Sequence, residues 1–145
     1  MILSPRLKAG RHFYEGVIMN DKKSVLSRNA PQPRGPYSQA VIHNNILYIS
    51  GQGPIDPVTN EVVNGTVEQE TLRVLENIKA IASEAGAALG NILKMTCYLA
   101  DINDFASFNS AYKNYFIKEP PARTTIQAGG LPASMKIVID AVVAL

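Results

Sequence analysis

Arg123 is the residue best suited to chemistry in this chain. It follows Pro120-Pro121-Ala122 at the predicted start of a strand. Its planar guanidinium matches a carboxylate with two parallel hydrogen bonds. Considered alone, the position fits two interpretations equally well: an anchor for a small carboxylate ligand, or a structural ion pair with a neighbouring acid.

A second candidate is the segment Ser50-Gly51-Gln52-Gly53, which stands at the predicted end of a strand. Two glycines let the backbone approach a ligand closely. The segment is not a phosphate-binding P-loop, because no Gly-Lys-Ser/Thr follows it. By itself it is more typical of a plain turn.

Asn109 interrupts an apolar stripe on the second predicted helix. Phe105, Phe108, Tyr112 and Tyr115 form that stripe, and Asn109 falls on it by spacing. A polar group in this place needs hydrogen-bond partners. We expect Asn109 either to tie down a loop or to face a ligand site.

Asp140 is an acid within an apolar strand. Alternation along the strand places Val138, Asp140 and Val142 on one face. The interpretation we favour is a pair with an arginine or lysine. The alternative is a general base with a raised pKa.

The remaining reactive residue types argue against several classes of protein. The single cysteine, Cys97, excludes an internal disulfide and a multi-cysteine metal site, and its apolar surroundings predict a small buried side chain. His12 and His43 are far apart and suggest neither a metal site nor a catalytic pair. A net charge of +2 is too small to favour nucleic-acid binding.

The chain divides into an N-terminal extension, residues 1–23, and one domain, residues 24–145. The extension is a weak organellar targeting segment, an ordered strand or arm, or sequence upstream of a working start at Met19. The sequence does not choose among these three. No apolar run is long enough to cross a bilayer, and the cysteine content favours a reducing, cytoplasmic compartment, with organellar targeting as the alternative.

The pattern after residue 24 predicts an α/β (α+β) fold. A capping box at Thr66 and Gln69 begins a helix that Gly86 ends, and Leu72, Leu75, Ile78, Ile81 and Ala85 are its expected apolar stripe. A second helix is expected over 105–116. Strands are expected at 24–27, 37–43, 46–50, 92–100, 122–128 and 137–143, with a hairpin turn at Asn44-Asn45. This order predicts a mixed sheet with both helices on one face.

Four segments together resemble the Rid (YjgF/YER057c/UK114) family. They are Gly35-Pro36-Tyr37-Ser38-Gln39-Ala40, Tyr48-Ile49-Ser50-Gly51-Gln52, Leu99-Ala100-Asp101-Ile102-Asn103-Asp104-Phe105 and Pro121-Ala122-Arg123. The resemblance implies a chorismate-mutase-like fold and a homotrimer with ligand clefts between subunits. It also implies hydrolysis of 2-imino and enamino acids, such as 2-iminobutanoate and 2-iminopropanoate, to 2-oxo acids and ammonia, without cofactor or metal.

The resemblance also assigns roles to residues of this chain. Arg123 corresponds to the arginine that grips the substrate carboxylate, and Asn109 to the helix residue that orients the arginine side of the site. Tyr37 corresponds to the aromatic residue that lines the cleft from the neighbouring subunit. Ser50 and Gly51 correspond to the strand-end residues beside the ligand.

Two positions depart from the family pattern. Thr125 stands where many bacterial members have cysteine, although its backbone amide could still bind substrate. Val138 stands where the family has a water-holding glutamate, and Asp140 is the candidate replacement. An imine deaminase is therefore the leading hypothesis. A non-catalytic carboxylate-binding trimer or stress chaperone is the alternative, and an endoribonuclease or translation inhibitor is less favoured.

Overall fold

The computed structural model describes residues 12–14, 17–19 and 21–145. Most of the predicted N-terminal extension lies outside the described residues, so its targeting alternative stays a prediction, as does the working start at Met19. Within it, strands β1 (His12–Tyr14) and β2 (Val17–Met19) pair antiparallel. The domain boundary at residue 23 stays a prediction.

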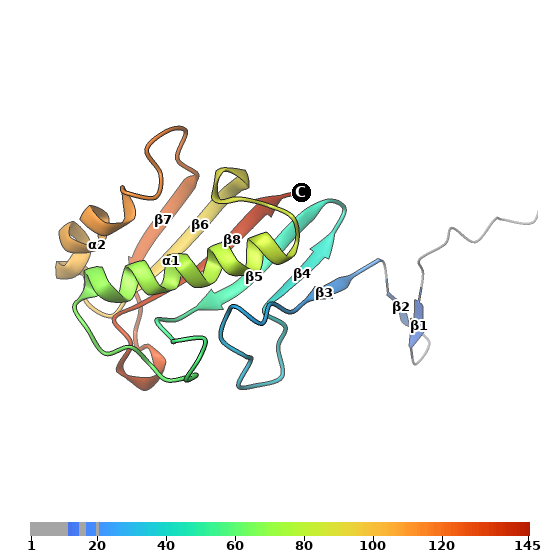
Figure 1. Ribbon diagram of the computed structural model, residues 1–145, viewed down its shortest axis with the longest axis horizontal. Coiled ribbons are helices and arrows are strands. Elements are labelled where there is room, and N and C mark those ends of the chain that lie inside the picture. The colour runs from blue at the N-terminus through green and yellow to red at the C-terminus, as the bar shows by residue number, and fades with distance from the viewer. Residues whose placement is uncertain (1–11, 15–16, 20) are drawn as a thin grey trace, which may run out of the picture.

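The domain is a six-stranded sheet with two helices on one face (Figure 1). The strand order is β3-β4-β5-β8-β6-β7, and only β6 and β7 run parallel. The strands are β3 (Lys23–Val25), β4 (Ala40–His43), β5 (Ile46–Gln52), β6 (Ile92–Leu99), β7 (Ala122–Gln127) and β8 (Ile137–Ala144). Helix α1 (Val67–Glu84) and helix α2 (Phe105–Tyr112) are accompanied by three short 3₁₀ turns, Leu89–Asn91, Ile102–Asp104 and Pro132–Ser134. The predicted mixed sheet with both helices on one face is confirmed.

The β4–β5 hairpin forms at the predicted turn. Asn44 and Asn45 both have positive φ, 49° and 62°, as a two-residue turn of this type requires. The predicted break at Gly51, however, is wrong. Strand β5 continues to Gln52, with a register shift against β8 between Ile49 and Gln52. An irregularity of this kind bends a strand without ending it.

Helix α1 begins at the predicted capping box, in which the backbone N–H groups of Thr66 and Gln69 each donate to the other residue's side chain. Gly86 takes a φ of 83° just beyond its end. One expected core residue, Leu72, is 40% exposed, because the buried stripe runs one residue away from it. The apolar residues of α1 that are buried are Val67, Val74, Leu75, Ile78, Ile81 and Ala82.

Helix α2 is shorter than the predicted 105–116 and ends at Tyr112. After it, the N–H groups of residues 114–116 each bond to a carbonyl three residues back, not four. The chain therefore tightens into turns before Pro120-Pro121. None of the helices in the described ranges is long and apolar enough to cross a membrane.

The two faces of the sheet have different environments. Under the helices, β8 buries Ile137, Ile139, Ala141 and Val143, and its alternate residues are half-buried on the other face. The predicted alternation of Val138, Asp140 and Val142 is thus confirmed. We call this second surface the open face. By strand register it also carries Tyr48, Lys94, Thr96, Tyr98, Thr124 and Ile126.

Candidate functional site

Arg123 is held by one amide and three aromatic rings. Its Nη1 donates a hydrogen bond of 2.8 Å to Oδ1 of Asn109. The guanidinium carbon lies 4.6 Å from the ring centroid of Tyr112, 5.2 Å from that of Phe108 and 5.7 Å from that of Phe105. The electron-rich ring faces attract a cation at these distances. The side chain is therefore fixed in orientation without losing its charge.

No acid neutralises Arg123 among the residues that the structure describes. The ion pair found there joins Lys136 to Glu70. The alternative of a structural ion pair thus finds no partner for Arg123 in the part of the chain that the structure describes. Since guanidinium has five N–H donors and Asn109 accepts from one nitrogen, donors remain for an anionic ligand.

The positions of Arg123 and its partners follow from the local sequence. Pro120-Pro121 ends the turns after α2, and β7 starts at the next residue on the sheet edge. Arg123 pairs in register with Met95, which is buried beneath the helices, so Arg123 points to the helix side. Strand β7 and helix α2 thus bring Arg123 against Asn109, as the predicted site requires.

The aromatic contribution to this site was missed by the sequence reasoning. Phe108 and Tyr112 are buried, as a core-facing stripe should be, but they also present ring faces to Arg123. The sequence did offer a signal, because the helix with this aromatic stripe is followed directly by the strand that carries Arg123. A cavity of about 320 Å³ lies beside the guanidinium. Its lining residues are Asn109, Tyr112, Lys113, Phe116, Pro120, Pro121 and Arg123.

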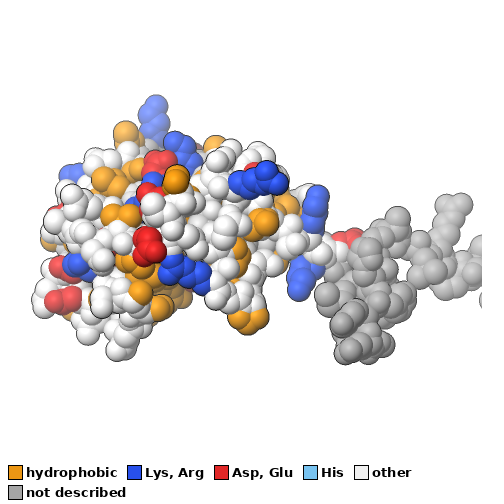
Figure 2. Space-filling model, turned by 60° about the horizontal axis from the view of Figure 1, so that its bottom comes forward, with side chains coloured by type: hydrophobic (Ala, Val, Ile, Leu, Met, Phe, Trp, Pro, Cys, Tyr) orange, Lys and Arg blue, Asp and Glu red, His pale blue; other side chains and the backbone are white. Residues whose placement is uncertain are grey.

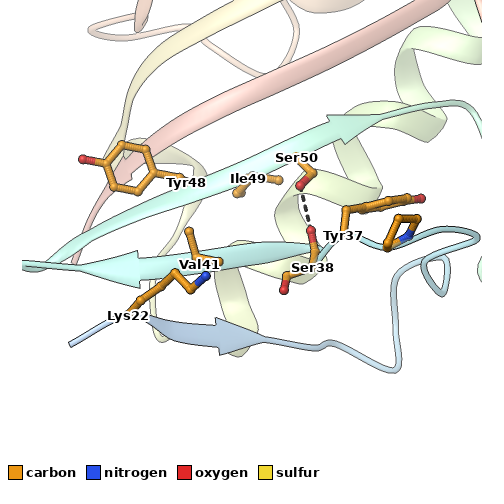
Figure 3. A pocket seen from close by; sticks show the side chains of 8 residues that line it. Lys22, Tyr37, Ser38, Val41, Tyr48, Ile49 and Ser50 are labelled. Carbon is orange, nitrogen blue, oxygen red and sulfur yellow. Dashed lines mark hydrogen bonds between the residues drawn. The ribbon is translucent and has the colours of Figure 1, made fainter. Parts of the chain in front are cut away.

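A second group of predicted site residues lies around the end of β5 (Figure 3). Ser50 Oγ donates a hydrogen bond of 2.7 Å to the carbonyl of Ser38, which fixes the hydroxyl. Tyr37 is 52% exposed and offers its ring to solvent or to a partner. The cavity here measures about 390 Å³. Its lining residues are Lys22, Pro36, Tyr37, Ser38, Val41, Tyr48, Ile49 and Ser50.

Gln39 organises this second region, and sequence reasoning gave it no role. Its side chain is buried and bonds three backbone groups: it accepts from the N–H of Ser27 and donates to the carbonyls of Ser27 and Pro31. The backbone carbonyl of Gln39 accepts a hydrogen bond from the backbone N–H of Ser50. Gln39 therefore fixes the Pro-rich connector beside Ser50. The signal in the sequence was its place in the segment Gly35-Pro36-Tyr37-Ser38-Gln39-Ala40, which contributes to the family resemblance.

Val138 lies directly against Gly51. A Cβ added to Gly51 would be 3.0 Å from Cγ1 of Val138, so the glycine leaves room for this side chain. Valine has no group that can hold a water by hydrogen bonds or carry a proton. The side chain beside Gly51 is therefore apolar, as the sequence departure implied.

Asp140 pairs with Tyr98, and the favoured expectation of a pair with arginine or lysine is wrong. The Tyr98 hydroxyl donates to Oδ2 of Asp140 at 3.0 Å. This hydrogen bond to the carboxylate raises the pKa of Tyr98. In register, Asp140 is opposite Thr96 on the open face. Arg123 points to the helix side, so within one chain the two predicted catalytic residues lie on opposite faces of the sheet.

Thr125 lies two residues beyond Arg123 on the same side of β7, in register with Cys97. Its hydroxyl is buried and has no hydrogen-bond partner. Cys97 is fully buried, as predicted, and burial raises the pKa of its thiol to about 12. The thiol is therefore protonated near neutral pH and does not act as a nucleophile. A substrate-binding role for Thr125 stays a prediction.

The Arg123 region and the Ser50 region are separated within one chain. Three ladder steps lie between β5 and β7, which corresponds to about 14 Å. A four-carbon acid cannot bridge that distance. Neither region holds a metal-binding cluster, since no group of three His, Cys, Asp or Glu residues forms in the described ranges.

Comparisons with known proteins agree with this architecture. The family model described as Endoribonuclease L-PSP matches residues 27–145. A RutC family protein of Pyrococcus abyssi is 46% identical over 121 residues, covering 83% of this chain and 95% of that protein. The 2-iminobutanoate/2-iminopropanoate deaminase of Homo sapiens is 41% identical, with 83% and 88% covered. The crystal structure of E. coli TdcF with bound serine superimposes with a TM-score of 0.81 at 36% identity, covering 85% of this chain and 98% of that one.

Proposed function

Because this chain belongs to the Rid (YjgF/YER057c/UK114) family, we propose that it hydrolyses reactive 2-imino acids to 2-oxo acids and ammonia. The substrates would be short species such as 2-iminobutanoate and 2-iminopropanoate, in line with the name of the human relative. Water adds to C2 of the imine, and the C–N bond then breaks as the nitrogen takes up protons and leaves as ammonia.

The observation that carries the proposal is the state of Arg123. This cation is half-buried, ordered by Asn109 and three rings, and has no acid partner among the described residues. A pre-oriented fork with free donors suits the carboxylate that every 2-imino and 2-oxo acid carries. The serine-bound TdcF structure supports this interpretation, because serine also carries a carboxylate.

A complete site requires a second copy of the chain. We expect a homotrimer in which Tyr37, Ser50 and Gly51 of one protomer face Arg123 of the next. The open face supports an interface between copies, because Tyr48 and Ile126 on it are 46% and 45% exposed. Apolar side chains gathered on one uncovered face are typical of association surfaces.

Ser50 offers a place for the attacking water. Its hydroxyl proton is already donated to the carbonyl of Ser38, so the lone pairs of Oγ are free to accept a hydrogen bond from water. Holding the carboxylate at Arg123 then places C2 against that water. Orientation alone contributes substantially to such reactions, and imines already hydrolyse in water.

A binding protein without hydrolysis is the second candidate, and Val138 favours it. Among the described residues, the side chain directly beside Gly51 is this valine, which cannot accept a proton from water. An RNA-cleaving function has less support. On the face shown in Figure 2, basic side chains are dispersed among acidic and apolar ones and form no stripe. Nucleic-acid sites are normally marked by such a stripe.

The test couples a threonine dehydratase to this protein and follows 2-oxobutanoate release, with semicarbazide competing for the imine. We expect release to accelerate in proportion to the protein added and the semicarbazide adduct to decline. Ser50→Ala and Arg123→Ala should both reduce the acceleration. A rate equal to the spontaneous rate, with 2-oxobutanoate still bound, would establish the binding function in place of hydrolysis.

A further inference from the structure

A second cation lines the cavity beside Arg123. Lys113 is exposed at the end of α2 and belongs to the same lining of the 320 Å³ cavity. Neither the resemblance nor the comparisons give it a role. Its role follows from its placement and rests on the proposed binding of carboxylates at Arg123.

The placement of Lys113 is fixed by the helix. It comes four residues after Asn109, and its backbone N–H donates to the Asn109 carbonyl at 3.1 Å. Residues four apart lie on the same side of a helix. The amide that orients Arg123 and the ammonium of Lys113 are therefore stacked one turn apart along the same wall.

The charge of this cavity is uncompensated. Both charged residues in its lining are basic, and no Asp or Glu lines it among the described residues. Lys113 forms no ion pair in the described part of the chain. Apart from Asn109, the other lining residues are Tyr112, Phe116, Pro120 and Pro121, which are largely apolar. Attraction between charges is stronger beside such walls than in open water.

We propose that Lys113 forms a second anion subsite, and that the Arg123 cavity takes 2-oxo and 2-imino acids that carry a second anionic group. Arg123 holds the carboxylate next to the keto or imino carbon. Lys113 attracts the distal carboxylate of a short dicarboxylate such as 2-oxoglutarate. Because lysine is a point charge on a flexible stem, it accommodates more than one chain length. The volume of the cavity falls within the usual range for small-molecule sites.

Binding of stable 2-oxo acids tests this without any turnover. Dissociation constants of 2-oxobutanoate and 2-oxoglutarate are measured by calorimetry for the full chain, at low and at high salt. The variants are Lys113→Met and, as matched control, Lys118→Met, which removes the same charge from a residue outside the cavity lining. The parent should bind 2-oxoglutarate more tightly, by about fivefold at low salt.

Lys113→Met should bring the ratio of the two dissociation constants close to one, and Lys118→Met should keep the parent ratio. High salt should also reduce the parent's preference. An unchanged ratio in Lys113→Met, with 2-oxobutanoate still bound, overturns the second subsite. Thermal unfolding identifies a purely structural role of Lys113. In that case Lys113→Met would lower Tm and leave the ratio of the two dissociation constants unchanged.

The same measurements keep the two proposals apart. If the parent binds 2-oxoglutarate through Lys113 but does not accelerate imine hydrolysis, the hydrolysis fails and the second subsite stands. If neither 2-oxo acid binds the parent, the Arg123 anchor fails and the second subsite fails with it.

Discussion

The two regions of the candidate site are built in contrasting ways. Around Arg123, one chain supplies the cation, its hydrogen-bond acceptor, three rings and a cavity. Around Ser50 and Gly51, it supplies a fixed hydroxyl and an apolar wall at Val138. Several groups therefore orient the arginine that would bind an anion, whereas the Ser50 hydroxyl is the group placed to hold the attacking water. Binding and chemistry can therefore be separated by substitutions in one region or the other.

Removing the anchor should have the largest effect. Arg123→Ala deletes a charge-assisted pair at a half-buried position, and we expect 2-oxobutanoate binding to weaken about a hundredfold. Arg123→Lys should recover only part of it, because an ammonium lacks the planar fork. Calorimetry with Arg28→Ala, an exposed arginine outside both cavities, provides the control. Undiminished binding in Arg123→Ala would place the carboxylate elsewhere.

Adding an acid to the Ser50 region should raise the rate of hydrolysis without changing the binding of the carboxylate. Val138→Glu places a carboxylate next to Gly51, where the absent Cβ leaves space. A proton acceptor in a fitting position raises hydrolysis rates by about a hundredfold or more, and an acceptor introduced by substitution should give about tenfold in kcat. The coupled dehydratase assay measures this. Val138→Gln has the same size without the charge and should show no gain.

If Val138→Glu and Val138→Gln behave alike, water activation does not depend on a carboxylate here. The hydroxyl of Ser50 would then be the group we expect to orient the water. Substrate KM should change little in either variant if the anchor is indeed on the other side of the cleft.

The sequence predicted those features that depend on local rules. The Asn44-Asn45 turn, the Thr66 capping box and the Gly86 end of α1 each follow from the conformations that one or two residues favour. The alternation of β8 was equally readable, because residues two apart share a face. Arg123 could be singled out because its guanidinium matches a carboxylate and because the surrounding motifs resemble those of the Rid family.

Features that depend on distant segments were not predictable in the same way. Tyr98 is the partner of Asp140 only because β6 and β8 are neighbours in the strand order, although 42 residues separate them. The rings around Arg123 required α2 to pack beside β7. Likewise, β5 runs past Gly51 because pairing with β8 outweighs the flexibility of glycine. Each of these features depends on which strands and helices are neighbours, and the spacing of apolar residues in the sequence does not reveal that order.

Asn109 gives a smaller, graded test of the Arg123 region. Asn109→Ala removes one hydrogen bond to the guanidinium, and 2-oxobutanoate binding should weaken about three- to fivefold. Asn109→Asp instead supplies the acid that Arg123 lacks, so it should compete with the ligand and weaken binding further. Calorimetry ranks the two variants. If Asn109→Asp binds 2-oxobutanoate as tightly as Asn109→Ala or more tightly, Arg123 does not contact the ligand carboxylate.

Alkaline unfolding gives the smallest effect and compares the two faces of the sheet beneath these regions. Cys97 lies beneath the Arg123 side, and burial raises the pKa of its thiol from 9.0 to about 12. Tyr98 lies on the open face, and its hydrogen bond to Asp140 raises the pKa of its hydroxyl from 10.0. A group whose folded pKa is raised stabilises fully below its unfolded pKa. That stabilisation is lost as pH climbs toward the folded value.

The two groups should therefore act in different pH windows. Between about pH 9 and 10, the free energy of unfolding should fall mainly through Cys97, by at most about 1.4 kcal/mol per pH unit. Tyr98, Tyr112 and Tyr115, whose pKa values are all raised, should add to the fall only above about pH 10. Urea unfolding across this range should give a flatter slope for Cys97→Ala in the lower window. For Tyr98→Phe the slope should flatten only in the upper pH window.

The slope between pH 9 and 10 contradicts this account if it is the same in Cys97→Ala and in the parent. Water would then reach the thiol, and with it the layer of the protein beneath Arg123. The low-dielectric support for the anchor would then be absent, and the contrast between a prepared binding region and a sparse chemical one would lose its structural basis.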